Sequence, residues 1–173
     1  MKKFLVVLVL AAVIATGTVF ADHPGGLGFG VQGGGGGTWS GGGFGVNRGA
    51  ALSLKIPSMP IFWAIDIEGN SLGVYLGIAG DYYFVDSALV PGIGLNWYFG
   101  FGVGAGIGIY NDIYFSIVAR LPVGLSWQLD INAGPIDAFE IYLQAVPSLG
   151  ISLNPFKFPA GGWPINVGFR LWF

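Results

Sequence analysis

Between residues 92 and 110 the sequence reads GIGLNWYFGFGVGAGIGIY, in which apolar residues take the odd positions and glycine takes most of the even ones. Successive side chains of a β-strand point to opposite faces, so a period of two predicts strand structure. One face of this segment is apolar and the other is nearly bare. A fold that contains this segment must give its two faces different surroundings.

The same alternation, with glycine, polar and charged residues on the second face, recurs in four other segments: residues 71–84, 113–129, 137–153 and 163–173. The segment 113–129 keeps its phase through Pro122, so we expect one strand with a local kink. The segment 49–67 changes phase at PSMP, residues 57–60, which is either a bulge or a turn. We favour the bulge.

Composition indicates what surrounds the apolar face. The chain is 53% apolar and only 9% charged, whereas about a quarter of a typical soluble domain is charged. Beyond residue 21 no run of about 20 apolar residues is free of glycine, proline or polar groups, which argues against membrane helices. Only helices and closed barrels satisfy every backbone hydrogen bond in lipid. The sequence therefore predicts an all-β fold, a closed antiparallel transmembrane β-barrel.

The strand count follows from segment lengths. At about 3.3 Å per residue the segment 92–110 would span roughly 60 Å, about twice a hydrocarbon core, so we place a turn at FGF, residues 99–101. The result is an eight-stranded barrel, an even number as in bacterial barrels, with strands at residues 25–32, 49–67, 71–84, 89–98, 102–110, 113–129, 137–153 and 163–173. Ten strands result if PSMP and the bend at Pro122 are both turns.

Inward glycines have a steric explanation in a barrel of this size. The interior of an eight-stranded barrel is just wide enough for side chains to fill. A bare wall therefore leaves room for large groups opposite, for which the candidates are Tyr75, Tyr83, Tyr142 and Arg120. Low-complexity drift that tolerates small residues is the alternative explanation.

The first 21 residues contain two lysines, an apolar run and small residues at Val19 and Ala21, which is typical of a cleaved secretory signal peptide. An uncleaved membrane anchor is the alternative. We expect residues 22–173 to form the barrel domain, with both ends on the periplasmic side. The chain has no cysteine, which excludes a lipid-modified N-terminus and disulfide bonds.

Connections that alternate from the periplasmic side leave four outward loops, at residues 33–48, near 85, near 111 and at 154–162. The first and last are the longest. They carry the candidate binding residues, which are Trp39, Phe44, Arg48, Phe156, Lys157 and Phe158. The glycine-rich stretches near the first loop lack the helix and the Lys-Ser/Thr pair of a phosphate loop.

Charged residues at inward positions predict a polar network inside the barrel. Its expected members are Arg120, Glu140 and Arg170 on three successive strands, and Asp81, Asp66 and Lys55 on the other wall. The network is either a structural plug or the lining of a solute path, and we favour the plug. Removing one partner of such an incompletely solvated ion pair costs on the order of 3 kcal/mol.

The sequence gives little support for an enzymatic function. His23 is the only histidine, and its place beside the cleavage site predicts a flexible terminal residue rather than a catalytic base. The expected mature chain has five lysine and arginine residues against nine carboxylates, which argues against nucleic acid as a partner. We predict a non-enzymatic protein that needs no metal or cofactor.

The last strand ends in GFRLWF, with Phe169, Leu171 and Phe173 on one face. Together with the signal peptide and the alternating strands, this ending resembles the small eight-stranded outer-membrane barrels of the OmpA transmembrane-domain and OmpX type. More narrowly, LSLKIPSMPIFWAI, ARLPVGLSW and VPSLGI resemble segments of an uncharacterised family of spirochaete barrels. The resemblance implies the outer membrane of a diderm bacterium, contact with its lipid, and recognition of the terminal residues by the barrel assembly machinery.

We therefore expect a barrel whose lumen is filled by its own side chains. Its expected role at the cell envelope is either structural or the binding of an extracellular ligand of unknown identity. A narrow pore for small solutes is the first alternative. An adhesin that acts through residues 33–48 and 154–162 is the second, although the glycine-rich first loop departs from the charged, extended loops of adhesive barrels.

Overall fold

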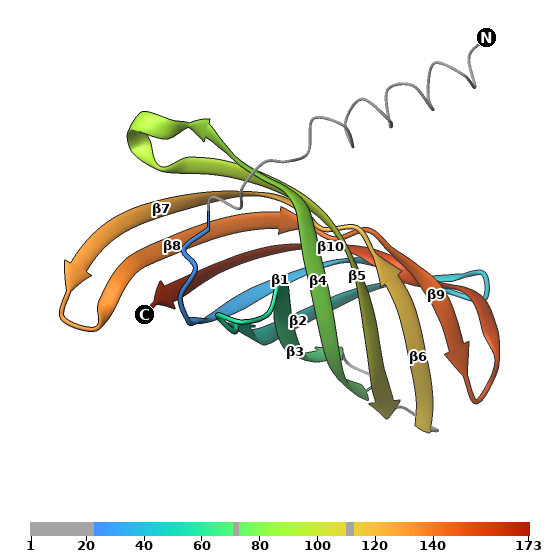
Figure 1. Ribbon diagram of the computed structural model, residues 1–173. Coiled ribbons are helices and arrows are strands. Elements are labelled where there is room, and N and C mark those ends of the chain that lie inside the picture. The colour runs from blue at the N-terminus through green and yellow to red at the C-terminus, as the bar shows by residue number, and fades with distance from the viewer. Residues whose placement is uncertain (1–22, 71–72, 110–112) are drawn as a thin grey trace, which may run out of the picture.

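The computed structural model describes residues 23–70, 73–109 and 113–173, which form one sheet (Figure 1). Its strands are β1 Gly28–Ser40, β2 Gly43–Lys55, β3 Ile61–Asn70, β4 Gly73–Val90, β5 Leu95–Ile109, β6 Ile113–Arg120, β7 Val123–Ala133, β8 Ile136–Ala145, β9 Ser148–Leu153 and β10 Lys157–Trp172. A short helix, η1 Pro91–Ile93, precedes β5. Among these residues no helix is long and apolar enough to cross a membrane. The expected signal peptide and the expected loop near residue 111 lie outside the described residues.

The sheet closes on itself through β1, which pairs antiparallel with β2 on one edge and with β10 on the other. β6 and β7 are one strand interrupted at residues 121–122, since both pair with β5. Likewise β8 and β9 are one strand interrupted at residues 146–147, since both pair with β10. The ten segments therefore form a ring of eight strands, which confirms the predicted fold class and the predicted kink at Pro122.

The two ends of the barrel carry different connections. The terminal end is where β1 begins at Gly28 and β10 ends at Trp172, which lie opposite each other. The far end carries the turn at residues 41–42 and the turn at residues 154–156. Figure 1 shows the strands running between these ends, with the β4–β5 and β7–β8 hairpins extending beyond the others.

The alternation of the segment 92–110 runs through β5 without a turn. Even residues from Asn96 to Gly108 face the lumen, and odd residues from Trp97 to Ile109 face outward. The predicted turn at residues 99–101 is wrong. The prediction compared the length of an untilted strand with the thickness of a hydrocarbon core, but barrel strands tilt, so a longer strand fits the same thickness. The chain turns instead at η1, after which Gly94 adopts a φ of 69°.

Two further boundaries differ from the prediction. Residues 33–48 are not a loop but lie in β1 and β2, which are joined by a tight turn at Gly41 and Gly42, with φ values of 56° and 89°. The glycine run of β1 holds strand structure because it pairs with a neighbour on both sides. Residues 56–60 form a turn and not a bulge, in which the Met59 N–H donates to the Ile56 carbonyl at 3.0 Å.

A bulge in β4 changes which side chains enter the lumen. Tyr83 pairs with Gly100 and Val85 pairs with Phe99, which leaves Phe84 without a partner in the ladder. The extra residue shifts the phase of the strand. Asp86, two residues further on, is consequently buried. The predicted outward loop near residue 85 is therefore wrong.

Several inward glycines lie beneath aromatic rings, in agreement with the steric explanation. A Cβ atom added to Gly106 would overlap the Tyr75 ring, and one added to Gly124 would overlap the Tyr98 ring. Each tyrosine thus occupies the space that a side chain on the neighbouring strand would need. This is a packing reason for glycine in a strand, where glycine otherwise weakens the structure.

We expect Gly124→Ala to destabilise the barrel by about 1–3 kcal/mol, because its methyl group would overpack against a fully buried ring. The measurement is the midpoint of thermal unfolding in detergent micelles. Gly92→Ala is the matched control, since no atom lies within 4 Å of a Cβ at that position. Equal midpoints for the two variants would contradict the packing explanation.

Candidate functional site in the lumen

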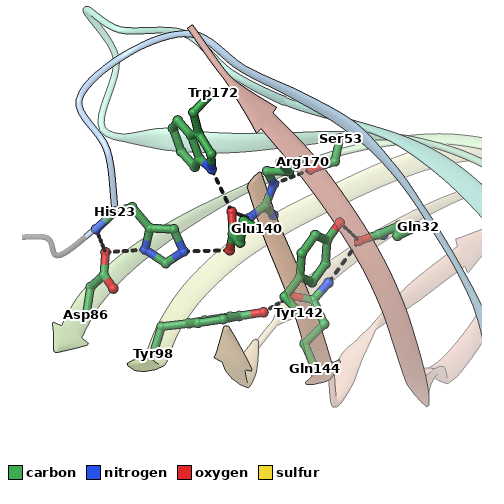
Figure 2. Close-up of polar contacts among 10 residues, drawn as sticks. All are labelled: His23, Gln32, Ser53, Asp86, Tyr98, Glu140, Tyr142, Gln144, Arg170 and Trp172. Atoms are coloured by element: carbon green, nitrogen blue, oxygen red, sulfur yellow. Dashed lines mark hydrogen bonds and ion pairs between the residues drawn. The ribbon is translucent and has the colours of Figure 1, made fainter. Parts of the chain in front are cut away.

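The terminal end of the lumen is filled by an ion pair between Glu140 on β8 and Arg170 on β10 (Figure 2). Arg170 Nη1 donates to both Glu140 oxygens at 3.1 Å, and its Nε donates to Ser53 Oγ at 2.7 Å. Trp172 Nε1 donates to Glu140 Oε2 at 3.0 Å. Glu140 and Arg170 are 0% and 2% exposed. This pair is therefore shielded from water on every side.

Simple strand geometry brings the two charges together. Arg170 and Glu140 lie directly opposite each other in the β8–β10 ladder, and both stand at inward positions. The guanidinium also lies over aromatic rings, with its Cζ 4.1 Å from the Tyr142 centroid and 4.9 Å from the Phe62 centroid. Such contacts favour a cation where water is excluded. The sequence placed both residues among the expected members of a lumen network without pairing them, and here they form one ion pair.

His23 completes this cluster. The sequence predicted a flexible terminal residue at this position, and that prediction is wrong. Its Nδ1 lies 2.5 Å from Asp86 Oδ2, and its Nε2 lies 2.9 Å from Glu140 Oε1. Burial lowers the pKa of His23, but the carboxylates of Glu140 and Asp86 raise it by more, so that the pKa is about 9. The imidazole is thus a cation held between two carboxylates at neutral pH.

An uncharged layer follows toward the far end. Tyr98 donates to the Gln144 side-chain oxygen at 3.0 Å, and the Gln144 amide nitrogen donates to Gln32 Oε1 at 3.1 Å. Tyr142 donates to the same Gln32 oxygen at 3.0 Å. All four side chains are buried. This layer lies next to the ion cluster in the lumen, and we call the two layers the plug.

A second ion pair lies beyond the plug. Arg120 Nε and Nη2 donate to the two oxygens of Asp81, each at 3.1 Å, so the pair is bidentate. Asp66 and Arg120 both line the lumen cavity that lies beyond the plug. Lys55 does not join the network, contrary to the prediction, because it stands at the end of β2 and its Nζ donates to the Ile56 and Met59 carbonyls of the following turn.

A cavity of about 700 Å³ occupies the lumen from the plug to the far end. Inward glycines of β1, such as Gly34 and Gly36, leave one wall bare. Asp66 and Glu68 of β3 stand in another wall, beside the stacked rings of Tyr75 and Tyr114, whose centroids are 6.4 Å apart. The volume lies within the range of roughly 300–1,000 Å³ that is typical of small-molecule pockets.

The predicted binding residues lie on strands or on short turns at the far end. Trp39 belongs to β1, Phe44 and Arg48 belong to β2, and Lys157 and Phe158 belong to β10. Phe156 lies in the turn before β10. They do not form two long loops, because the segments expected as loops are paired in the barrel wall. Phe44, Phe156 and Phe158 are 71%, 68% and 62% exposed.

Parts of the site had no signal in the sequence. Asp86 was missed because its inward position depends on the bulge at Phe84, which alternation alone does not reveal. His23 was missed because it precedes the first strand and no periodicity governs it. Gln32 and Gln144 were detectable, since both stand at inward positions of their strands. Within the described residues no cluster of three or more histidine, cysteine or acidic side chains is arranged to hold a metal ion.

Comparison with known proteins supports the fold. The crystal structure of Neisserial surface protein A (NspA) superimposes with a TM-score of 0.53 and 14% sequence identity, covering 87% of this chain and 98% of that chain. The two proteins share a barrel fold. No family model matches the sequence, and no curated protein matches it. At 14% identity the similarity to NspA speaks for architecture alone, so the resemblance to a spirochaete family stays a prediction.

We expect Glu140→Ala to lower the unfolding free energy by about 3–5 kcal/mol, because it leaves Arg170 and His23 buried without their shared partner. The thermal midpoint in detergent measures this effect. Asp137→Ala is the matched control, since Asp137 is an exposed carboxylate on the same strand. An unchanged midpoint for Glu140→Ala would show that the plug does not stabilise the barrel.

Proposed function

We propose that the protein is an integral outer-membrane barrel that does not conduct solutes and that presents a ligand-binding cup at the cell surface. The plug closes the lumen at the terminal end, and the cavity reaches the far end. In this proposal the terminal end faces the periplasm and the far end faces outward. The role is structural or binding, and the protein is not an enzyme.

The outer face of the barrel supports a membrane location. Large apolar side chains cover it on successive strands, and Ile65, Val103 and Ile117 are typical, with 52%, 50% and 50% of their surface exposed. Soluble monomers rarely expose apolar patches of more than a few hundred Å². The expected signal peptide and the likeness to a Neisserial surface protein agree with an outer-membrane location.

The observation that carries the proposal is the contrast between the two halves of the lumen. At the terminal end Trp172, Tyr98 and Glu140 are all 0% exposed. Toward the far end a cavity of about 700 Å³ remains. A pore would need a continuous path, so the narrow-pore alternative has less support. The adhesin alternative would use the exposed phenylalanines of the far end, Phe44, Phe156 and Phe158, in place of the predicted loops.

Two measurements on the mature protein test this proposal. Unboiled protein from the outer-membrane fraction is expected to migrate faster in a detergent gel than boiled protein, because a closed barrel stays compact. In a planar bilayer the same preparation is expected to show no steady conductance. Recovery in a soluble fraction without a mobility shift would exclude the membrane barrel. Discrete conductance steps would overturn the closed lumen and favour the pore.

A further inference from the structure

The barrel wall alone leaves unbalanced charge at its terminal end. Asp86 on β4 and Glu140 on β8 are 2% and 0% exposed, and Arg170 on β10 pairs with Glu140. No second arginine or lysine of the described wall pairs with either carboxylate. Burying an unpaired carboxylate costs several kcal/mol. The wall therefore needs a further cation at this place.

His23 supplies that cation from outside the wall. It lies in the segment before β1, yet its side chain is only 1% exposed. In Figure 2 the imidazole lies between Asp86 and Glu140 and points one ring nitrogen at each. Only the protonated imidazole has two N–H donors, so this geometry selects the charged form. The N-terminal segment is thereby tied to strands on two sides of the lumen.

Four aromatic rings from four strands enclose the same imidazole. Its ring centroid lies 5.1 Å from that of Phe62, 5.7 Å from that of Tyr98, 5.9 Å from that of Trp172 and 6.0 Å from that of Tyr83. Rings of this kind attract a cation whose hydration has been removed. We call the two carboxylates and the four rings the imidazolium box. Because Arg170 already balances one of the two carboxylates, the box has one negative charge left for a small planar monocation.

We propose that the imidazolium box is a binding site of the barrel for its own N-terminal segment, with the His23 side chain as the ligand. Docking of this segment finishes the plug, since it joins β4 to β8 and neutralises Asp86. The box selects an imidazolium, or a planar amidinium of similar size. This inference extends the proposed closed lumen, but its first test does not depend on conductance or on location.

The single histidine of the chain makes that test direct. In the mature protein without an affinity tag, in micelles, we expect nitrogen-detected NMR to show both ring N–H groups of His23 at neutral pH. The ring is expected to titrate near its pKa of about 9. A ring that exchanges freely with water and titrates near the ordinary pKa of about 6.5 would overturn the proposal. A conducting barrel with a docked ring would overturn the closed lumen only.

A variant with a chemical rescue tests the ligand. We expect His23→Ala to lower the thermal midpoint and added imidazole to restore it, because free imidazolium can enter the vacated box. Gly25→Ala is the control in the same segment, since nothing lies within 4 Å of a Cβ there, and it should respond to neither change. If His23→Ala folds with an unchanged midpoint, or if imidazole has no effect beyond that on the Gly25→Ala control, the box is not a ligand site.

The pH dependence has a defined sign. Because the pKa of His23 is raised in the folded state, its stabilisation is complete below about pH 6.5 and is lost as the pH rises through about 9. The groups that face the ring are Asp86 and Tyr83 of β4, Glu140 of β8, Arg170 of β10 and Tyr98 of β5. The midpoints of the native chain and His23→Ala should therefore converge at high pH, and a constant difference would contradict this role.

Discussion

Pairing of every strand with two neighbours is the constraint on which this structure depends. In lipid an unpaired backbone N–H or carbonyl costs several kcal/mol, so a membrane sheet must have no free edge. Here the edge is removed by the pairing of β1 with β10, over a ladder that runs from Gly28 to Ser40. Once the ring is closed, each residue must face either the outside of the barrel or its lumen, and the alternation of the sequence decides which. The apolar exterior and the crowded interior both follow from this closure.

The lumen of an eight-stranded barrel is narrow, and its terminal end is shielded from water. Glycine in one strand makes room for a tyrosine from the next, as Gly124 does for Tyr98. Charge can remain inside only when it is compensated, and Arg170 compensates Glu140 across a single ladder step. The same requirement explains why a residue from outside the wall enters the lumen. Packing and charge balance thus produce the plug together.

The two halves of the lumen suit different roles. The terminal end is held by charged hydrogen bonds that join β2, β4, β8 and β10 through His23 and Arg170. The far half keeps a cavity beside Asp66, Glu68 and the Tyr75 ring. A closed base below an open space is the form expected of a binding cup and not of a channel. In the proposed outer-membrane location, the orientation of the barrel determines from which side of the envelope a ligand reaches the cavity.

The alternation predicted much of this molecule without its coordinates. It correctly predicted the all-β barrel, the kink at Pro122 and the inward positions of Glu140, Arg170, Arg120 and Asp81, because the side-chain period of a strand is a local property. The count of eight strands was also right, but only because two errors cancelled: β5 was divided into two strands, and β2 and β3 were joined into one. The positions of the turns were harder to predict from the sequence. The turn predicted at residues 99–101 and the bulge predicted at PSMP failed because strand tilt and ladder register are properties of the closed ring.

The remaining features were decided by tertiary structure alone. Asp86 enters the lumen because a bulge at Phe84 reverses the phase of β4, and a bulge is defined by the partner strand. His23 is buried because the lumen offers two carboxylates and a set of rings, and those groups come from separate parts of the chain. The sequence by itself determined which face of each strand is apolar, since that depends only on residue order. The meeting of distant charges was decided by closure of the barrel, which alone places β3, β4, β8 and β10 around one interior.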